Sequence, residues 1–497
     1  MECPMRIGRE SFKNKIGWRF DNTYNNLPDV MLSRLRPVPV KSPKLVILNE
    51  ALSNELDLNL SSIESEDLAA MFSGNLLPDG SQSLAQAYAG HQFGHFTMLG
   101  DGRAIIIGEH LTKNNKRFDI QFKGSGLTPY SRSADGRAAL SPMLREYIIS
   151  EAMYALNIPT TRSLAVVTTG ENVIRETTLP GAVLTRVASS HLRVGTFQYV
   201  AMQNDIKLLK ILVDYTIQRH YPKLKDKNNL ALELFKAVTE RQIELVIHWM
   251  RVGFIHGVMN TDNMTISGET IDYGPCAFMD TYNPETVFSS IDHQGRYSYF
   301  NQPGITNWNL SRFAETLIPL INEKEDRAIE IVNENINNFG EIYKKKWLLM
   351  MKKKLGLFGD EIQDENLIND LLEWMNQKKA DYTNTFCSLM KGDIKNEKIF
   401  QDSNFIRWYK RWSIRLTQNN KSKKISLNLM RANNPLIIPR NHIVEDSLNA
   451  ASSNKNLKPI YSLLEYLKYP YENRSGISNF QTTPKLNSQA YKTFCGT

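Results

Sequence analysis

Two residues in the first half of this sequence have the types and spacing expected of a phosphate-binding pair. Lys123 ends the alternating segment FDIQFK and precedes a glycine-rich turn, which places its ammonium group at a sheet edge facing a cleft. Glu146 follows in a segment with helical spacing, where it shares a row with Ile149 and Met153. A carboxylate on such an apolar face needs a cationic partner, and Lys123 is the natural candidate. A strand lysine paired with a glutamate on the next helix aims an amine at nucleotide phosphates, so the pair predicts a nucleotide site.

A second group of residues has the types of a metal site. The loop HGVMNTDN resembles the phosphotransferase pattern HGDxxxxN, and its Asn263 stands seven positions after His256. Asp272 comes nine residues later, after a segment, MTISGETID, that predicts a tight hairpin. Hard oxygen ligands on two adjacent loops suit Mg²⁺ or Mn²⁺ bound to phosphates, so Asn263 and Asp272 are the predicted metal ligands.

One position departs from that phosphotransferase pattern. Val258 stands where the pattern has its catalytic aspartate, and valine can neither accept a proton nor orient a hydroxyl group. Asp262, next to the predicted metal ligand Asn263, is the nearest ionisable substitute, but it cannot occupy the same place in the cleft as residue 258. The protein is therefore expected either to be inactive or to catalyse a different reaction from phosphoryl transfer.

Several other residues could contact a polyphosphate because of their type alone. Glycines let a backbone approach phosphate closely, and guanidinium groups match phosphate oxygens. Taken singly, a GxG string is more often a turn and a surface arginine is more often solvated. The candidates are Gly100, Gly102 and Arg103 in LGDGRA, Asp135 and Gly136 in SADGRAA, and Arg186 and Arg193 near the change from strands to helices.

The elements that must position these residues follow from the hydrophobic periodicity. Two strands joined by a turn are expected first, then a helix of about 16 residues capped by Ser141 and Pro142, then three strands in a meander. Helical periods replace strands beyond residue 200. The predicted strands span 103–111, 118–123, 163–169, 172–178 and 182–188, and the predicted helices include 207–219 and 230–252.

This order predicts an α+β fold with a β-rich N-terminal lobe that contains one key helix, and a mostly helical C-terminal lobe. We expect four parts: an N-terminal extension at 1–84, the β-rich lobe at 85–200, the helical lobe with the metal loop at 201–420, and a C-terminal extension at 421–497. The last part is polar, and its fold cannot be predicted from its sequence.

Composition narrows the class of protein. The 497 residues are 41% hydrophobic and 23% charged, which is the balance of an ordinary soluble enzyme or binding protein. The net charge of +8 suits an anionic ligand but does not demand a nucleic acid. Four scattered cysteines exclude a zinc ribbon or a disulfide framework. No signal peptide or membrane span stands out, so we expect a cytoplasmic protein without nucleic-acid or membrane partners.

The strings that carry these residues resemble the selenoprotein O family of protein adenylyltransferases, called YdiU-like in bacteria. The similarity covers residues 85 to 320 and includes AYAGHQFG, LGDGRA, DIQFKGSGLTPYSRSADGRAAL, LREYIISEAM, HGVMNTDNM and DYGP. The resemblance implies a protein-kinase-like two-lobed fold that binds ATP in a flipped orientation. It also implies transfer of AMP to Ser, Thr or Tyr hydroxyls of other proteins, which would explain Val258.

The same resemblance implies a role for each matching residue. Glu146 would orient Lys123, Asn263 and Asp272 would hold Mg²⁺ or Mn²⁺, and Asp262 would accept the proton. Cys495, in the C-terminal string YKTFCGT, would be a redox-active thiol. The residues that would contact ATP are Gly100, Gly102, Arg103, Lys123, Asp135, Gly136, Arg186, Arg193 and Asp272.

Three other functions remain open for the same cleft. They are a Mn²⁺-dependent protein uridylyltransferase, a conventional kinase and a catalytically silent scaffold that binds a nucleotide. The origin of the transferred phosphate distinguishes these functions, since only a kinase transfers the γ-phosphate.

Overall fold

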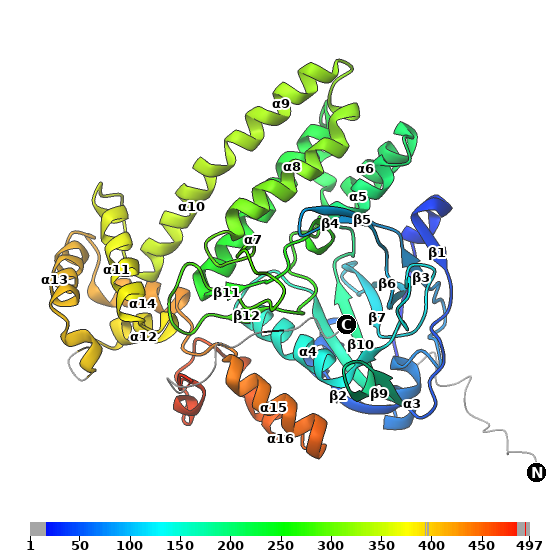
Figure 1. Cartoon of the computed structure of the whole chain (residues 1–497), viewed down its shortest axis with the longest axis horizontal. Coiled ribbons are helices and arrows are strands. Elements are labelled where there is room, and N and C mark those ends of the chain that lie inside the picture. Colours follow the sequence, from blue (N-terminus) through cyan, green and yellow to red (C-terminus); the bar gives the residue numbers. More distant parts are fainter. Residues whose placement is uncertain (1–15, 393, 395–396, 485–492, 494–497) are drawn as a thin grey trace, which may run out of the picture.

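The structure, a computed structural model, describes residues 16–392, 394, 397–484 and 493. It is a mixed α/β fold in which one antiparallel sheet forms a sheet lobe and the chain beyond it is mostly helical (Figure 1). The strand order in the sheet is β1-β3-β6-β7-β10-β9-β2, and β8 pairs with β10. These strands are β1 (Leu32–Arg34), β2 (Lys44–Leu48), β3 (Leu84–Gln86), β6 (Ala104–Leu111), β7 (Arg117–Lys123), β8 (Ala138–Ala139), β9 (Arg162–Ile174) and β10 (Thr178–Ala188).

Helices cover both faces of this sheet because side chains alternate along its strands. On one face, Val166 and Leu184 are buried in the cluster that includes α4 (Leu140–Ala155). On the other face, Val167 and Val183 are buried with the short helices α2 (Glu50–Glu55) and α3 (Ser65–Phe72). The segment before residue 85 thus supplies β1, β2 and these two helices to the sheet lobe.

The first two strands and the helix after them lie where the sequence predicts them. Helix α4 has 16 residues and begins at Leu140, but its N-cap is Ala139, so Ser141 is not the cap. Ile149 and Met153 are buried beside Glu146, as their spacing predicts. The predicted face of α4 is therefore confirmed.

The predicted meander of three strands after α4 is wrong. Only two long strands, β9 and β10, form there, and they turn at residues 175–177. The sequence GE does not end a strand, because Gly170 takes a φ of +72° inside β9, and the register with β10 shifts between Pro180 and Ala182. A bulge therefore absorbs residues that look like turns in the sequence.

The predicted hairpin over MTISGETID is also wrong as a strand pair. Its turn forms, with the Gly268 N–H donating to the Thr265 carbonyl at 3.3 Å. Its two arms do not pair with each other, however, since Thr265 bridges to Arg193 and Thr270 bridges to Thr160. The segment therefore ties the metal loop to two other parts of the chain.

The helical region is built around α7 (Leu230–Val252), which packs against α6 (Ile206–His220), α8 (Gln302–Ile321) and α10 (Phe339–Lys354). Both α6 and α7 match the predicted helices closely. Two small strand pairs join this region: β4 (Ala89–Gln92) with β5 (His95–Met98), and β11 (Phe254–Ile255) with β12 (Ala277–Phe278). The other helices up to residue 433 are α5 (Val194–Ala201), α9 (Glu325–Asn337), α11 (Asp364–Lys378), α12 (Tyr382–Lys391), α13 (Ser403–Thr417) and α14 (Lys423–Asn433).

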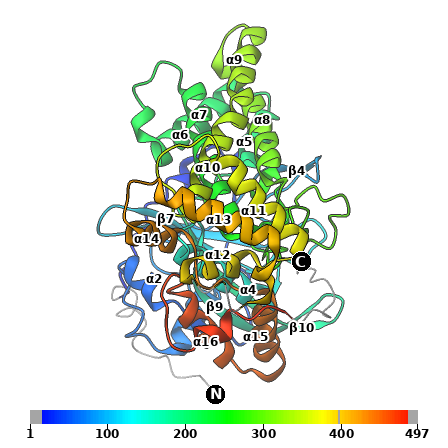
Figure 2. The same cartoon turned by 90° about the vertical axis from the view of Figure 1, so that its left-hand side faces the viewer.

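Beyond residue 433 the chain returns to the sheet lobe. Helices α15 (Asn441–Asn454) and α16 (Lys458–Leu467) pack against α4, as Figures 1 and 2 show. Glu445 of α15 pairs with Arg145 of α4 at 2.6 Å, and the Tyr461 hydroxyl of α16 donates to the Val46 carbonyl in β2 at 3.2 Å. Helices α15 and α16 therefore brace the helix that carries Glu146. No helix within the described ranges is long and apolar enough to cross a membrane.

Candidate active site

Lys123 and Glu146 form the pair that the sequence predicts. Lys123 ends β7, in the middle of the sheet, and its Nζ lies 2.7 Å from the Glu146 Oε2 on α4. The same Nζ lies 2.8 Å from the Asp272 Oδ1. Both Lys123 and Glu146 are buried, so the ammonium group is held between two carboxylates in a site of low dielectric constant.

Arg186 joins this pair from the neighbouring strand β10. Its Nε donates to the Glu146 Oε1 at 2.8 Å, and its Nη2 donates to the Asp272 Oδ1 at 2.6 Å. Burial alone would lower the pKa of Arg186, but the carboxylates of Asp272 and Glu146 raise it above its ordinary value. The guanidinium is thus charged and locked in place, which is the condition for binding a phosphate without rearrangement.

Arg193 is the third buried cation of the site. Its guanidinium lies 3.8 Å from both the Asp272 Oδ2 and the Asp101 Oδ1, and its Nη1 donates to the Asp262 carbonyl at 3.3 Å. It also stacks over the ring of Tyr88 at 4.4 Å. Lys123, Arg186 and Arg193 therefore surround one carboxylate, that of Asp272.

Asp272 has both an unusual backbone conformation and a shifted pKa. Its φ is +62°, in the left-handed region, which aspartate tolerates better than most residues. Burial would raise the pKa of Asp272, but Arg186, Lys123 and Arg193 hold it well below its usual value. Asp272 is therefore an anion at neutral pH.

Asp262 and Asn263 lie on a short 3₁₀ turn, Thr261–Asn263. The Asn263 Nδ2 donates to the Val258 carbonyl at 3.0 Å, which leaves its Oδ1 as the amide atom that can bind a cation. Burial raises the pKa of Asp262 to about 6, and Arg193 partly offsets that effect. Asp262 Oδ1 is buried and has no hydrogen-bond partner within the part of the chain that the structure describes.

These oxygens fit a divalent cation. The Asn263 Oδ1 and the Asp272 Oδ2 are hard ligands that no hydrogen bond recorded among the described residues occupies. No cluster of three or more His, Cys, Asp or Glu occurs over the described ranges, so phosphate oxygens would have to complete the coordination. Such a site suits Mg²⁺ or Mn²⁺, which bind one or two carboxylates together with substrate phosphates.

All the predicted site residues within the described part of the chain line one cavity of about 670 Å³. The fold thus gathers residues separated by up to 172 positions, from Gly100 to Asp272. Cys495 lies outside the described residues, and its redox role stays a prediction. The cavity-lining members of the predicted set are Gly100, Gly102, Arg103, Lys123, Asp135, Gly136, Glu146, Arg186, Arg193, Asp262, Asn263 and Asp272.

The glycines of LGDGRA have a packing role that the sequence does not reveal. An added Cβ at Gly100 would lie 2.4 Å from the Tyr130 ring, and one at Gly102 would lie 2.8 Å from the Tyr130 carbonyl oxygen. The loop is therefore pressed against residues 128–131. At the cavity mouth, Asp135 pairs with Arg175 at 2.8 Å, which lowers the pKa of Asp135.

Sequence reasoning missed Asp101, which stands between the two glycines of LGDGRA. Asp101 is buried in the cavity wall, and its Oδ2 accepts from the Gln86 N–H at 3.0 Å. Its position facing Arg193 balances one of the buried cations. The sequence contains one signal for Asp101: it is a charged residue between two glycines, directly before a strand.

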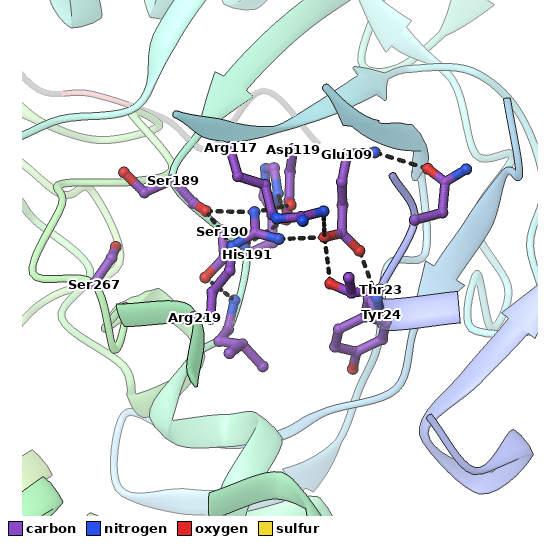
Figure 3. A network of polar contacts seen from close by, with 12 residues as sticks. Thr23, Tyr24, Glu109, Arg117, Asp119, Ser189, Ser190, His191, Arg219 and Ser267 are labelled. Atoms are coloured by element: carbon purple, nitrogen blue, oxygen red, sulfur yellow. Dashed lines mark hydrogen bonds and ion pairs between the residues drawn. The ribbon is translucent and has the colours of Figure 1, made fainter. Parts of the chain in front are cut away.

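Sequence reasoning also missed the network of polar contacts that fixes the chain between Arg186 and Arg193 (Figure 3). Ser189 N–H and Oγ donate to Glu269, while the Ser189 carbonyl accepts from Arg219 at 2.6 Å. His191 N–H donates to Asp119 at 2.9 Å, and Asp119 also pairs with Arg219 at 2.7 Å. Since this short connection lies between Arg186 and Arg193, the network sets the spacing of the two guanidinium groups.

A cavity lined by three buried cations, with a carboxylate and an amide beside them, is typical of enzymes that bind a nucleoside triphosphate. A sequence model of the family described as "Protein adenylyltransferase SelO" matches residues 15–468. The chain belongs to the SelO family.

Similar proteins from bacteria carry the name "Protein nucleotidyltransferase YdiU". The one from Pelagibacter ubique is 58% identical over 482 residues, which is 97% of this chain and 100% of that protein. The one from Nitrosococcus oceani is 58% identical over 97% of this chain and 98% of its own length. The one from Bacillus cytotoxicus is 55% identical over 98% of this chain and 100% of its own.

Proposed function

We propose that this protein is a protein adenylyltransferase that transfers AMP from ATP to Ser, Thr or Tyr hydroxyls of other proteins. Family membership supports the nucleotidyl class of the reaction. One observation carries the proposal: Val258 lines the cavity where a kinase has its base, while Asp262, whose Oδ1 has no hydrogen-bond partner among the described residues, lines the same cavity. The sheet lobe with its Lys123–Glu146 pair supports a protein-kinase-like arrangement of the chain.

The positions of the charges favour a flipped nucleotide. Lys123, Arg186 and Arg193 are buried around the Asp272 carboxylate, where they would hold the β- and γ-phosphates. The α-phosphate would then lie toward Asp262. In this orientation the group that reacts is the α-phosphorus, and the missing aspartate at position 258 is not needed.

The reaction is an attack of the acceptor hydroxyl oxygen on the α-phosphorus. A new O–P bond forms, the bond from the α-phosphorus to the α–β bridging oxygen breaks, and pyrophosphate leaves. Asp262 accepts the hydroxyl proton, and the three cations stabilise the charge that develops on pyrophosphate. A divalent cation held by Asn263 and Asp272 would supply charge neutralisation to the phosphate oxygens.

Labelled ATP tests this proposal directly. The protein is incubated with Mg²⁺ and ATP labelled at either the α- or the γ-phosphate, and the label bound to protein is measured. We expect label from the α-position only, and none after chelation of the metal with EDTA. Label from the γ-position would indicate a kinase, and ATP binding without transfer of either label would indicate a scaffold.

The base of the nucleotide needs its own test, because the relatives are named only as nucleotidyltransferases. We expect AMP transfer to exceed UMP transfer when ATP and UTP compete in Mg²⁺. Stronger incorporation from α-labelled UTP in Mn²⁺ would instead assign a uridylyltransferase.

Gly90 gives a prediction that depends on the position of Asp262. An added Cβ at Gly90 would lie 2.3 Å from the Asp262 Oδ1 and 2.9 Å from its Cβ, so Gly90→Ala must displace the Asp262 side chain. We expect transfer to fall about 100-fold, since a misplacement of about 1 Å can have that effect. The dissociation constant for ATP should stay within about twofold, since the three cations are untouched.

The matched control is Gly304→Ala, because a Cβ at Gly304 meets nothing within 4 Å. Steady-state transfer and calorimetric ATP binding are measured for both variants. Wild-type transfer by Gly90→Ala would show that Asp262 is not the proton acceptor.

A further inference from the structure

The hairpin β4–β5 rests directly on the turn that carries Asp262. The His91 N–H donates to the Thr261 Oγ1 at 2.7 Å, and the Phe93 N–H donates to the Asn260 Oδ1 at 3.1 Å. Gln92, at the end of β4, lines the active-site cavity. One side of the hairpin is therefore fixed beside the reacting end of the site.

The other side of the hairpin carries a row of contacting aromatic rings, of which Phe96 is exposed and His91 and Trp308 are half-buried. The His91 ring lies 5.1 Å from the ring of Phe96 and 5.3 Å from the ring of Trp308 on α8. Phe96 is 41% exposed, and Met98 beside it is 44% exposed. Joined apolar side chains at a surface mark a site of interaction, whereas a single exposed one does not.

Two arginines give this row of rings a positive charge. The guanidinium groups of Arg296 and Arg312 lie 4.8 Å and 5.1 Å from the centre of the Trp308 ring. Arg296 also reaches the hairpin tip, because an added Cβ at Gly94 would lie 3.9 Å from its guanidinium carbon. We call His91, Phe96, Trp308, Arg296 and Arg312 together the aromatic platform.

The charge of Arg296 is not balanced locally. Arg312 pairs with Glu315 at 2.6 Å, but Arg296 has no ion pair with a carboxylate among the residues described here. Asp292 is the acidic residue nearest to Arg296 in the sequence. Its carboxylate accepts hydrogen bonds from the backbone N–H groups of Arg296 and Tyr297, at 3.0 and 2.8 Å. A carboxylate from outside the chain would therefore find a guanidinium ready to bind it.

We propose that the aromatic platform binds the acceptor protein, through a segment of that protein rich in acidic side chains. Arg296 binds a carboxylate of the segment, and Phe96 and Trp308 pack against its apolar parts. The same hairpin contacts Thr261 and Asn260 on its opposite side, so a segment bound to the platform is separated from Asp262 by the hairpin. The part of the segment that extends past the hairpin would bring its hydroxyl group to Asp262. The role of this segment as acceptor rests on the proposed adenylyl transfer, but its binding does not.

Binding is tested with two fluorescently labelled copolymers, one of glutamate and tyrosine and one of lysine and tyrosine. Anisotropy is measured on the full chain without nucleotide. We expect the wild type to bind the glutamate copolymer more tightly, and Arg296→Glu to weaken that binding by at least about tenfold. Phe96→Ser, which leaves the charge unchanged, should weaken it as well.

The matched control is Arg407→Glu, which makes the same change of charge at an exposed position on α13 with no ion pair recorded among the described residues. Its binding should stay within about twofold of the wild type. Unchanged binding of the glutamate copolymer by Arg296→Glu, or a wild-type preference for the lysine copolymer, would overturn the proposal. All variants are first compared with the wild type by circular dichroism.

The same copolymers separate this proposal from the proposed function. With α-labelled ATP, the tyrosines of the glutamate copolymer should become labelled, and less so with Arg296→Glu at equal affinity for ATP. Binding that depends on Arg296 without any labelling would retain the platform and reject adenylyl transfer. Labelling that is equal in wild type and Arg296→Glu would retain the transfer and reject the platform.

Discussion

Asp272→Asn is expected to reduce AMP transfer by at least about 1000-fold, because it removes the one carboxylate that contacts all three cations and that we propose as a metal ligand. Asparagine keeps the size of the side chain and tolerates the φ of +62°, so the backbone is not strained further. The chain should remain folded, since Glu146 still pairs with both Lys123 and Arg186. Transfer is measured with α-labelled ATP over a range of Mg²⁺ and Mn²⁺ concentrations.

Asp57→Asn is a matched control for this variant. Asp57 also has a left-handed backbone, with a φ of +60°, but its carboxylate contacts only Lys113, through the backbone N–H and an ion pair at 3.9 Å, and Asp57 does not line the cavity. Its activity and melting temperature should equal those of the wild type. Metal-dependent transfer at the wild-type rate by folded Asp272→Asn would refute the metal assignment.

Asp262→Asn is expected to lower transfer by about 10²–10⁴-fold, which is the usual contribution of a general base. It should leave the affinity for ATP nearly unchanged, since the cations proposed to hold the triphosphate keep their partners. The rate of the chemical step is measured by rapid quench at saturating ATP, and the affinity is measured by calorimetry.

Asp205→Asn controls for the loss of an aspartate elsewhere. Asp205 is the exposed N-cap of α6, where asparagine is an equally good cap, so no property should change. A chemical step of unchanged rate in Asp262→Asn would mean that another group, or water, takes the proton.

Short sequence patterns predict the helices and strands whose conformation depends mainly on neighbouring residues. Helix α4 and the strand that ends at Lys123 follow from periodicity, and the polar pair between them follows from the cost of burying Glu146 alone. The bulge at Gly170 could not be predicted, because a glycine and an acid look the same in a bulge and in a turn. Its register depends on pairing with β10, which is a non-local contact.

The site residues likewise fall into two groups: those that the local sequence predicts, and those whose contacts depend on how distant parts of the chain pack together. Motif spacing identifies Lys123, Asn263 and Asp272, but it does not show that Arg186 contacts Glu146, because that contact depends on how β10 lies beside β7. The network of Asp119, Arg219 and Glu269 was missed because its members are ordinary charged residues, distant in sequence, that only the folded chain brings to one short connection.

The packing of α15 and α16 against α4 means that the support of the Glu146 helix comes from a part of the chain that is translated late. A nascent chain contains Lys123, Arg186 and Asp272 long before it contains α15 and α16, which pack against the helix of Glu146. On the ribosome, the catalytic centre is therefore complete in sequence but lacks the support of its key helix. We therefore expect a chain translated only as far as Asp272 to show little transfer, because α4 then lacks its contacts with α15 and α16.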